Sequence, residues 1–220
     1  MPPPGCPEWD YETHPDCGRL LPLASADVLR DIASGAHPVA KSVRDSRAIH
    51  RKLFAQLWPP GHAYYVGNFR GLERKKCLKD YDVRIPSDPL VGVPAAKVIE
   101  EITKLADEIA VMTEAVDAEL RDAGANISAA NRSISVVRLA CDAFVRFLTV
   151  HPFANGNGHV ARAILFILLR HFGFNPDRWT IEPRPRFPGG PDYSDMIYKH
   201  RRGDVAPLEQ FVLSCLSSIR

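Results

Sequence analysis

Residues 150–169 have the sequence VHPFANGNGHVARAILFILL, in which histidines, asparagines and glycines crowd into nine residues directly before an apolar run. We expect one helix to end at His151, because Pro152 cannot continue it, and a second helix to begin after the glycines. The unpaired N–H groups at a helix N-terminus attract anions, most often phosphate. The stretch therefore predicts a phosphate cradle between two helices, with His151 placed beside it to accept a proton.

Each residue type in this stretch suits that chemistry. Gly156 and Gly158 let the backbone approach a phosphate without interference from a Cβ atom. Asn157 can add a side-chain amide, and Arg162, one turn further along, can add a guanidinium fork. The sequence thus predicts an anion site with its own general base.

The rest of the chain predicts a mainly helical protein. Apolar residues at helical spacing and local stop signals indicate helices over residues 25–32, 39–58, 94–124, 133–149, 161–172 and 207–219. Residues 63–92 differ in kind, because their aromatics, glycines and prolines favour short extended pieces or a hairpin. We predict an N-terminal extension with a short helix (residues 1–36) followed by a single domain (residues 37–220).

Composition limits the function classes. The 220 residues are 45% hydrophobic and carry a net charge of +2, so a core is expected and nucleic acid is not an expected partner. The N-terminus lacks the pattern of a signal peptide, and the apolar run of residues 163–169 is far shorter than the roughly 20 residues that span a bilayer. Five scattered cysteines agree with free thiols in a reducing compartment. We expect a cytoplasmic protein without a membrane segment.

The stretch from His151 to Arg162, HPFANGNGHVAR, resembles the signature loop of Fic proteins. Upstream, Val66 to Gly71 (VGNFRG) and the extended residues that follow resemble the flap region that precedes the long central helix of Fic domains. This resemblance implies a mainly α, Fic-type helical bundle with a small β-hairpin flap at about residues 63–92 and the signature loop at residues 151–162.

The resemblance also implies an activity, because Fic proteins mostly transfer AMP from ATP to a hydroxyl side chain of a target protein, with Mg²⁺. The implied catalytic residues are His151 as general base, Asn157 and Arg162, with Phe153 as a buried anchor of the loop. Donor phosphates are expected to contact Gly156, Asn157, Gly158, His159 and Arg162. The target protein is expected to dock as an added strand against flap residues Leu72, Leu78, Tyr81 and Val83.

Two positions depart from the family pattern. Asn155 stands where the family has the carboxylate that holds magnesium, which predicts a weakened metal site. His159 stands where the family has its first arginine, which removes a fixed charge and a bidentate fork. Three interpretations stay open: a slower AMP transferase, a transferase with another nucleotide or phosphate-containing donor, and a catalytically weak fold that acts as a binding module of the toxin–antitoxin type.

Regulation in many Fic proteins uses an inhibitory helix in which serine or threonine precedes a glutamate by four positions. No glutamate of this chain has serine or threonine four positions before it. Inhibition within the chain is therefore not expected, and control is expected from a separate inhibitory partner or from delivery into another cell.

Overall fold

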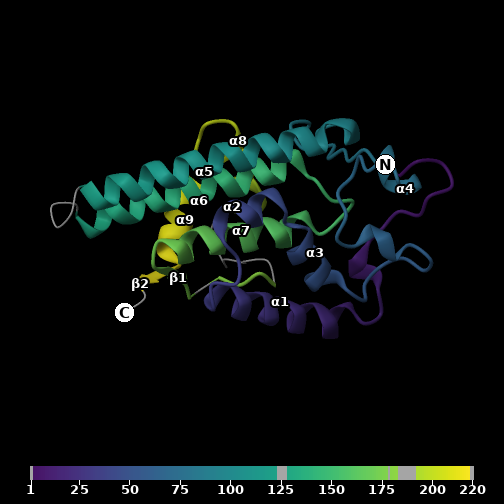
Figure 1. Cartoon of the computed structure of the whole chain (residues 1–220), viewed down its shortest axis with the longest axis horizontal. Helices are drawn as coiled ribbons and strands as arrows, with labels where there is room; N and C mark the ends of the chain where they lie inside the picture. The colour runs from purple at the N-terminus through teal and green to yellow at the C-terminus, as the bar shows by residue number, and fades with distance from the viewer. Residues whose placement is uncertain (1, 123–127, 178, 183–191, 219–220) are drawn as a thin grey trace.

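Two long helices, α5 (Val98–Asp122) and α6 (Ala129–Val150), lie side by side along the molecule (Figure 1). The computed structural model describes residues 2–122, 128–177, 179–182 and 192–218. Helices account for most of these residues, which confirms the mainly α prediction. None of the helices described is long and apolar enough to cross a bilayer.

Helix α7 (Asn157–His171) runs through the centre of the bundle (Figure 1). It packs against α6, and also against helices from the N-terminal third of the chain. Every residue from His159 to Leu169 is buried, so α7 is enclosed on all sides, as expected for a central helix. The other helical elements of the bundle include η1 (Tyr11–Thr13), α1 (Cys17–Ala33), α2 (Val39–Arg44), α3 (Arg47–Phe54), α8 (Tyr193–Arg201) and α9 (Ala206–Ser214).

Helix α6 delivers His151 to the end of the bundle. Ser128 caps its start, with the Ser128 hydroxyl accepting a hydrogen bond from the Asn131 N–H. One face of α6 is buried against its neighbours through Val136, Val137, Ala140, Cys141, Phe144 and Phe147. This apolar stripe fixes the rotation of α6 and therefore the direction in which its last residues point.

Several predicted helix boundaries are wrong. The helix predicted over residues 25–32 begins eight residues earlier, at Cys17, with Asp16 at its N-cap. The helix predicted over residues 39–58 breaks into α2 and α3, because Asp45 leaves helical geometry (φ −132°) and binds the Arg47 guanidinium (2.6 Å). Helix α8 was not predicted. The last helix stops at Ser214, and residues 216–218 then form a strand.

The predicted flap hairpin is also wrong. Residues 63–92 contain a 3₁₀ turn, η2 (Ala63–Tyr65), and one short helix, α4 (Lys76–Lys79), but no strand. Their backbone groups bond to other parts of the chain; the Gly92 N–H, for example, donates to the Thr149 carbonyl (2.9 Å). A two-stranded antiparallel sheet does occur elsewhere, where β1 (Phe174–Pro176) pairs with β2 (Leu216–Ser218).

The N-terminal segment packs into the core. Trp9 and Tyr11 are buried (3% and 4% exposed), and the Trp9 indole donates to the Leu57 carbonyl (2.7 Å). Cys6 forms a disulfide with Cys77 of α4, so the expectation of free thiols fails at this pair. The disulfide joins segments 71 residues apart and fastens the N-terminal segment to the flap region. The predicted boundary after residue 36 stays a prediction.

Candidate functional site

The loop between α6 and α7 is built as the sequence predicts, with one helix ending and another beginning around a short turn. His151 takes a left-handed conformation (φ 54°) at the end of α6, and Gly156 takes another (φ 76°) at the start of α7. Asn157 closes the turn, because its Oδ1 accepts from the Phe153 N–H (2.8 Å) and its Nδ2 donates to the Phe153 carbonyl (2.9 Å). The Asn157 amide therefore fixes the loop, and both of its ends are bonded to main chain instead of facing a phosphate.

Phe153 anchors the loop, as the resemblance implies. Its ring is fully buried and stacks on the His50 ring at 3.9 Å between centroids. The Gly67 N–H donates to His50 Nδ1 (2.9 Å), so the proton of the ring lies on Nε2, which donates to the Asn155 carbonyl (3.0 Å). Burial lowers the pKa of His50 to about 3, so this histidine is a neutral bridge between the loop and residue 67.

Asn155 is held at both ends of its amide. Its Nδ2 donates to the Trp9 carbonyl (2.9 Å), and its Oδ1 accepts from the Gly156 N–H (2.7 Å). Among the residues that the structure describes, no three His, Cys, Asp or Glu side chains gather where they could hold a metal. Magnesium prefers carboxylate oxygens. The Asn155 amide and the described residues around it offer no such set of ligands, so they do not fit a magnesium site made by protein side chains alone. A ligand role for Asn155 stays a prediction.

The two hydrogen bonds of the Asn155 amide predict the effect of Asn155→Asp. A carboxylate would lose the Nδ2 donor and place an anionic oxygen against the Trp9 carbonyl. We expect the free energy of unfolding to fall by about 1–3 kcal/mol. Urea unfolding of both proteins measures it, with Asn68→Asp for comparison because Asn68 also donates to a carbonyl, that of Tyr64. Unchanged stability together with activity at lower magnesium would support the ligand role instead.

His151 has the geometry of a general base. Its Nδ1 lies 3.2 Å from the Leu148 carbonyl, which can only accept, so Nδ1 carries the proton and Nε2 keeps a lone pair. Burial is the main cause that lowers the pKa of His151 to about 4, and the positive charges of Arg70 and Arg201 lower it further. The ring is therefore neutral at neutral pH and able to take a proton.

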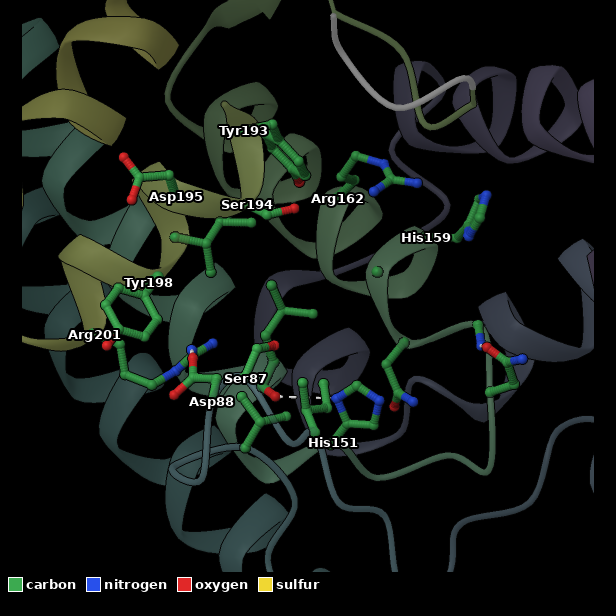
Figure 2. A pocket seen from close by; sticks show the side chains of 18 of the residues that line it. Ser87, Asp88, His151, His159, Arg162, Tyr193, Ser194, Asp195, Tyr198 and Arg201 are labelled. Carbon is green, nitrogen blue, oxygen red and sulfur yellow. Dashed lines mark hydrogen bonds and ion pairs between the residues drawn. The ribbon is translucent and has the colours of Figure 1, made fainter. Parts of the chain in front are cut away.

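A cavity of about 650 Å³ opens beside His151. One wall is the α6–α7 loop with the first turn of α7, and the opposite wall is helix α8 together with residues 85–91 (Figure 2). Helix α8 contributes Tyr193, Ser194, Asp195, Ile197, Tyr198 and Arg201. The predicted residues His151, Asn155, Gly156, Asn157, Gly158, His159 and Arg162 all line this one cavity, so the structure brings them together.

A carboxylate lies against two of the basic residues that line the cavity. His159 Nε2 lies 2.5 Å from Oε2 of Glu182, and Arg162 Nη2 lies 4.0 Å from the same oxygen. Arg162 also donates from Nε to the Ile181 carbonyl (2.7 Å), and its Nη2 has no hydrogen-bond acceptor in the part of the chain described. A glutamate of the chain itself therefore lies beside two residues of the proposed anion site, and the expectation of no inhibition within the chain stays a prediction.

The predicted docking residues do not form an exposed strand. Leu78 and Tyr81 belong to the core (0% and 4% exposed), so their side chains are not available to a docked protein. Leu72 and Val83 are half-buried. Docking of a target protein on this segment stays a prediction, without the strand pairing that was expected for it.

Sequence reasoning missed the residues that come to the site from far along the chain. They are Trp9, Tyr11, His50, Arg70, Glu182 and the residues of α8. Arg70 lies within the quoted VGNFRG stretch, so the sequence carried a recognisable signal for it. The others lie outside any local pattern.

Comparison with known proteins places the chain in a family. The profile of the Fic/DOC family matches residues 41–169. The protein adenylyltransferase Fic of Culex quinquefasciatus is 29% identical over 79 residues, which cover 36% of this chain and 15% of that protein. The protein of the same name from Nematostella vectensis is 29% identical over 79 residues, covering 36% of this chain and 17% of that protein. The match thus spans about a sixth of each relative.

Two solved structures share the fold. One is the BepC protein of Bartonella tribocorum, a VirB-translocated effector crystallised with bound AMPPNP (TM-score 0.56, 15% identity, 92% of this chain and 89% of that chain covered). The other is the N-terminal Fic domain of a VirB-translocated Bep effector protein from Bartonella quintana (TM-score 0.54, 15% identity, 92% and 84% covered). At this identity the likeness concerns the fold alone. Since the family profile covers more than half of the chain, the chain belongs to the Fic/DOC family.

Proposed function

We propose that this protein is an adenylyltransferase that moves AMP from ATP to a hydroxyl side chain of a target protein. The observation that carries the proposal is the meeting, in one cavity, of a neutral His151 imidazole, the N-terminus of α7 and the Arg162 guanidinium. A base, an anion-binding helix end and a cation are the groups that such a transfer needs. Relatives named protein adenylyltransferase Fic support the same chemistry.

The proposed reaction uses each group once. His151 Nε2 takes the proton of the target hydroxyl, and the hydroxyl oxygen attacks the α-phosphorus of ATP. The bond from the α-phosphorus to the bridging oxygen breaks, and pyrophosphate leaves. The N–H groups at the start of α7 and the Arg162 guanidinium stabilise the negative charge on the phosphate oxygens. Because these groups are fixed before the substrate binds, they stabilise the transition state without reorganising.

The donor and the partners belong to the same proposal. ATP is the proposed donor because the neighbour BepC was crystallised with AMPPNP and the cavity here has the size of a small-molecule site. We further propose that a target protein docks at the segment of residues 63–92. A separate inhibitory partner and a cytoplasmic location remain part of the proposal.

One experiment tests the transfer. The protein is incubated with a cell lysate and, in parallel, with ATP, GTP, CTP or UTP, and modified proteins are identified by mass spectrometry. We expect modified serine, threonine or tyrosine residues that gain the mass of AMP in the ATP sample. A different mass addition would favour another donor, and no addition with any nucleotide would favour a binding module.

The contact of Glu182 with His159 is the observation that favours the second candidate, a transferase with another phosphate-containing donor. The carboxylate lies where donor phosphates would approach His159 and Arg162, and it repels them. A donor with fewer charges at that end would meet less repulsion. Adding nucleoside diphosphates, whose phosphate end carries less charge, to the nucleotide panel separates the two candidates.

We expect Glu182→Gln to tighten nucleotide binding about tenfold, because a neutral amide no longer repels phosphate or competes for His159 and Arg162. Calorimetric titration with a non-hydrolysable ATP analogue measures the dissociation constant. Glu114→Gln removes the same charge from the exposed surface of α5 and serves as the matched control. Equal affinities in all three proteins would mean that the donor does not reach the side of the cavity at Glu182.

A further inference from the structure

The guanidinium of Arg70 is fully buried and bonded only to main chain. Its Nε donates to the His151 carbonyl (2.9 Å), Nη1 to the Tyr81 carbonyl (2.8 Å), and Nη2 to the carbonyls of Val93 (3.0 Å) and Val150 (3.2 Å). Within the described part of the chain no carboxylate forms an ion pair with it. Burial of a cation is unfavourable, and it lowers the pKa of Arg70 to about 10. A buried arginine with four hydrogen bonds therefore needs an explanation other than the filling of space.

The four carbonyls explain the need for a cation. Those of Val150 and His151 stand at the C-terminus of α6, where the last carbonyls lack partners within the helix and the helix dipole is negative. Those of Tyr81 and Val93 flank the irregular segment beside it. One planar side chain therefore joins the end of α6 to the segment that replaces the predicted hairpin.

His151 is the residue whose conformation depends on this junction. Among the described residues it is the one non-glycine with a positive φ (54°), at a helix end where glycine or asparagine is usual. A side chain in this region is strained and persists only where its surroundings hold it. The Arg70 Nε bond fixes the carbonyl of this very residue, and the imidazole then lines the cavity (Figure 2).

We propose that Arg70 is a positioning residue for the transfer reaction: its guanidinium holds the His151 backbone in the left-handed conformation that presents the imidazole to the cavity. This role rests on the proposed function of His151 as the base. A second consequence is electrostatic, because the Arg70 charge contributes to the lowered pKa of His151. Other charged groups near this side of the cavity include Arg201 and Arg202, which both pair with Asp88, and Asp82, whose negative charge acts on Arg70.

Two variants separate geometry from charge. Arg70→Lys keeps the charge and loses the fork, whereas Arg70→Gln keeps a donor and loses the charge. We expect kcat to fall about 100-fold in both, since small displacements of a reacting group have effects of that size, with little change in the KM for the nucleotide. The base acts when deprotonated, so activity is lost as pH falls through the pKa of His151. In the plot of activity against pH, this fall on the acid side is expected at higher pH in Arg70→Gln, because loss of the positive charge raises the pKa of His151. It is expected close to its original pH in Arg70→Lys, which keeps the charge.

NMR titration of the His151 ring compares the pKa of His151 in the same variants without any assay of transfer. Leu105→Ala in the core of α5, outside the cavity lining, is the control for lost stability alone. The proposal is overturned if kcat in the Arg70 variants falls no further than in Leu105→Ala, if the His151 titration does not move in Arg70→Gln, or if neither variant folds while Leu105→Ala does. Absence of transfer by the unaltered protein would instead remove the proposed function, whatever the titration shows.

Discussion

His151→Ala is expected to lower the rate of nucleotide transfer by about 10²–10⁴-fold, the usual effect of removing a general base. In the described part of the chain, the other histidine that lines the cavity, His159, is bonded to Glu182, and His50 uses both ring nitrogens, toward Asn155 and Gly67. Nucleotide binding is expected to change little, because the first turn of α7 and Arg162 remain. The measurement pairs the initial transfer rate with the dissociation constant of ATP.

His171→Ala is the matched control for this variant. His171 lies at the other end of α7, is exposed and pairs with Asp117 (3.1 Å). Its removal is expected to leave the transfer rate unchanged. If His151→Ala retained full activity, or lost nucleotide binding and transfer together, His151 would not be the base.

The largest effect on stability is expected for Gly156→Ala. Gly156 has φ +76°, and a Cβ atom there would stand 2.3 Å from Cε2 of Phe54. The Phe54 ring is fully buried among the rings of Trp9, Tyr11, His50 and His159, so it has no room to retreat. We expect a loss of about 2–4 kcal/mol in the free energy of unfolding, from strain and overpacking together. Denaturant unfolding monitored by circular dichroism measures it.

Gly173→Ala isolates the clash from the backbone strain. Gly173 also has a positive φ (+82°), but a Cβ atom there would meet nothing within 4 Å. This control is expected to lose about 1 kcal/mol through strain alone. Equal losses in the two variants would mean that the loop moves away from Phe54, and the rigid cradle described above would then be wrong.

The sequence was informative where structure is local. A proline after His151, glycines before α7 and apolar residues at helical spacing predicted the helix–loop–helix and placed His151 and Arg162 around one site. The long helix predicted over residues 94–124 is also present, as η3 (Ala95–Lys97) followed by α5. These features depend on neighbours within a few residues, which a single sequence displays.

The sequence was uninformative where partners are distant. The resemblance assigns Asn155 to the metal position, but the loop sequence says nothing of Trp9, which lies 146 positions earlier and accepts the Asn155 N–H. The hairpin was predicted from composition. In the structure, the Arg70 guanidinium instead donates hydrogen bonds to the carbonyls of Tyr81 and Val93. Glu182 reaches His159 only because the chain turns back after α7. Such pairings leave no periodicity to detect.

The most direct test of the central claim follows the phosphorus atoms of the donor. The protein and a substrate identified from the lysate are incubated with ATP labelled at the α-phosphorus and, in parallel, with ATP labelled at the γ-phosphorus. Adenylyl transfer with His151 as the base predicts that the substrate gains label from the α position alone. With His151→Ala it predicts no label on the substrate. Label from the γ position, or equal label from the His151→Ala protein, would contradict the account.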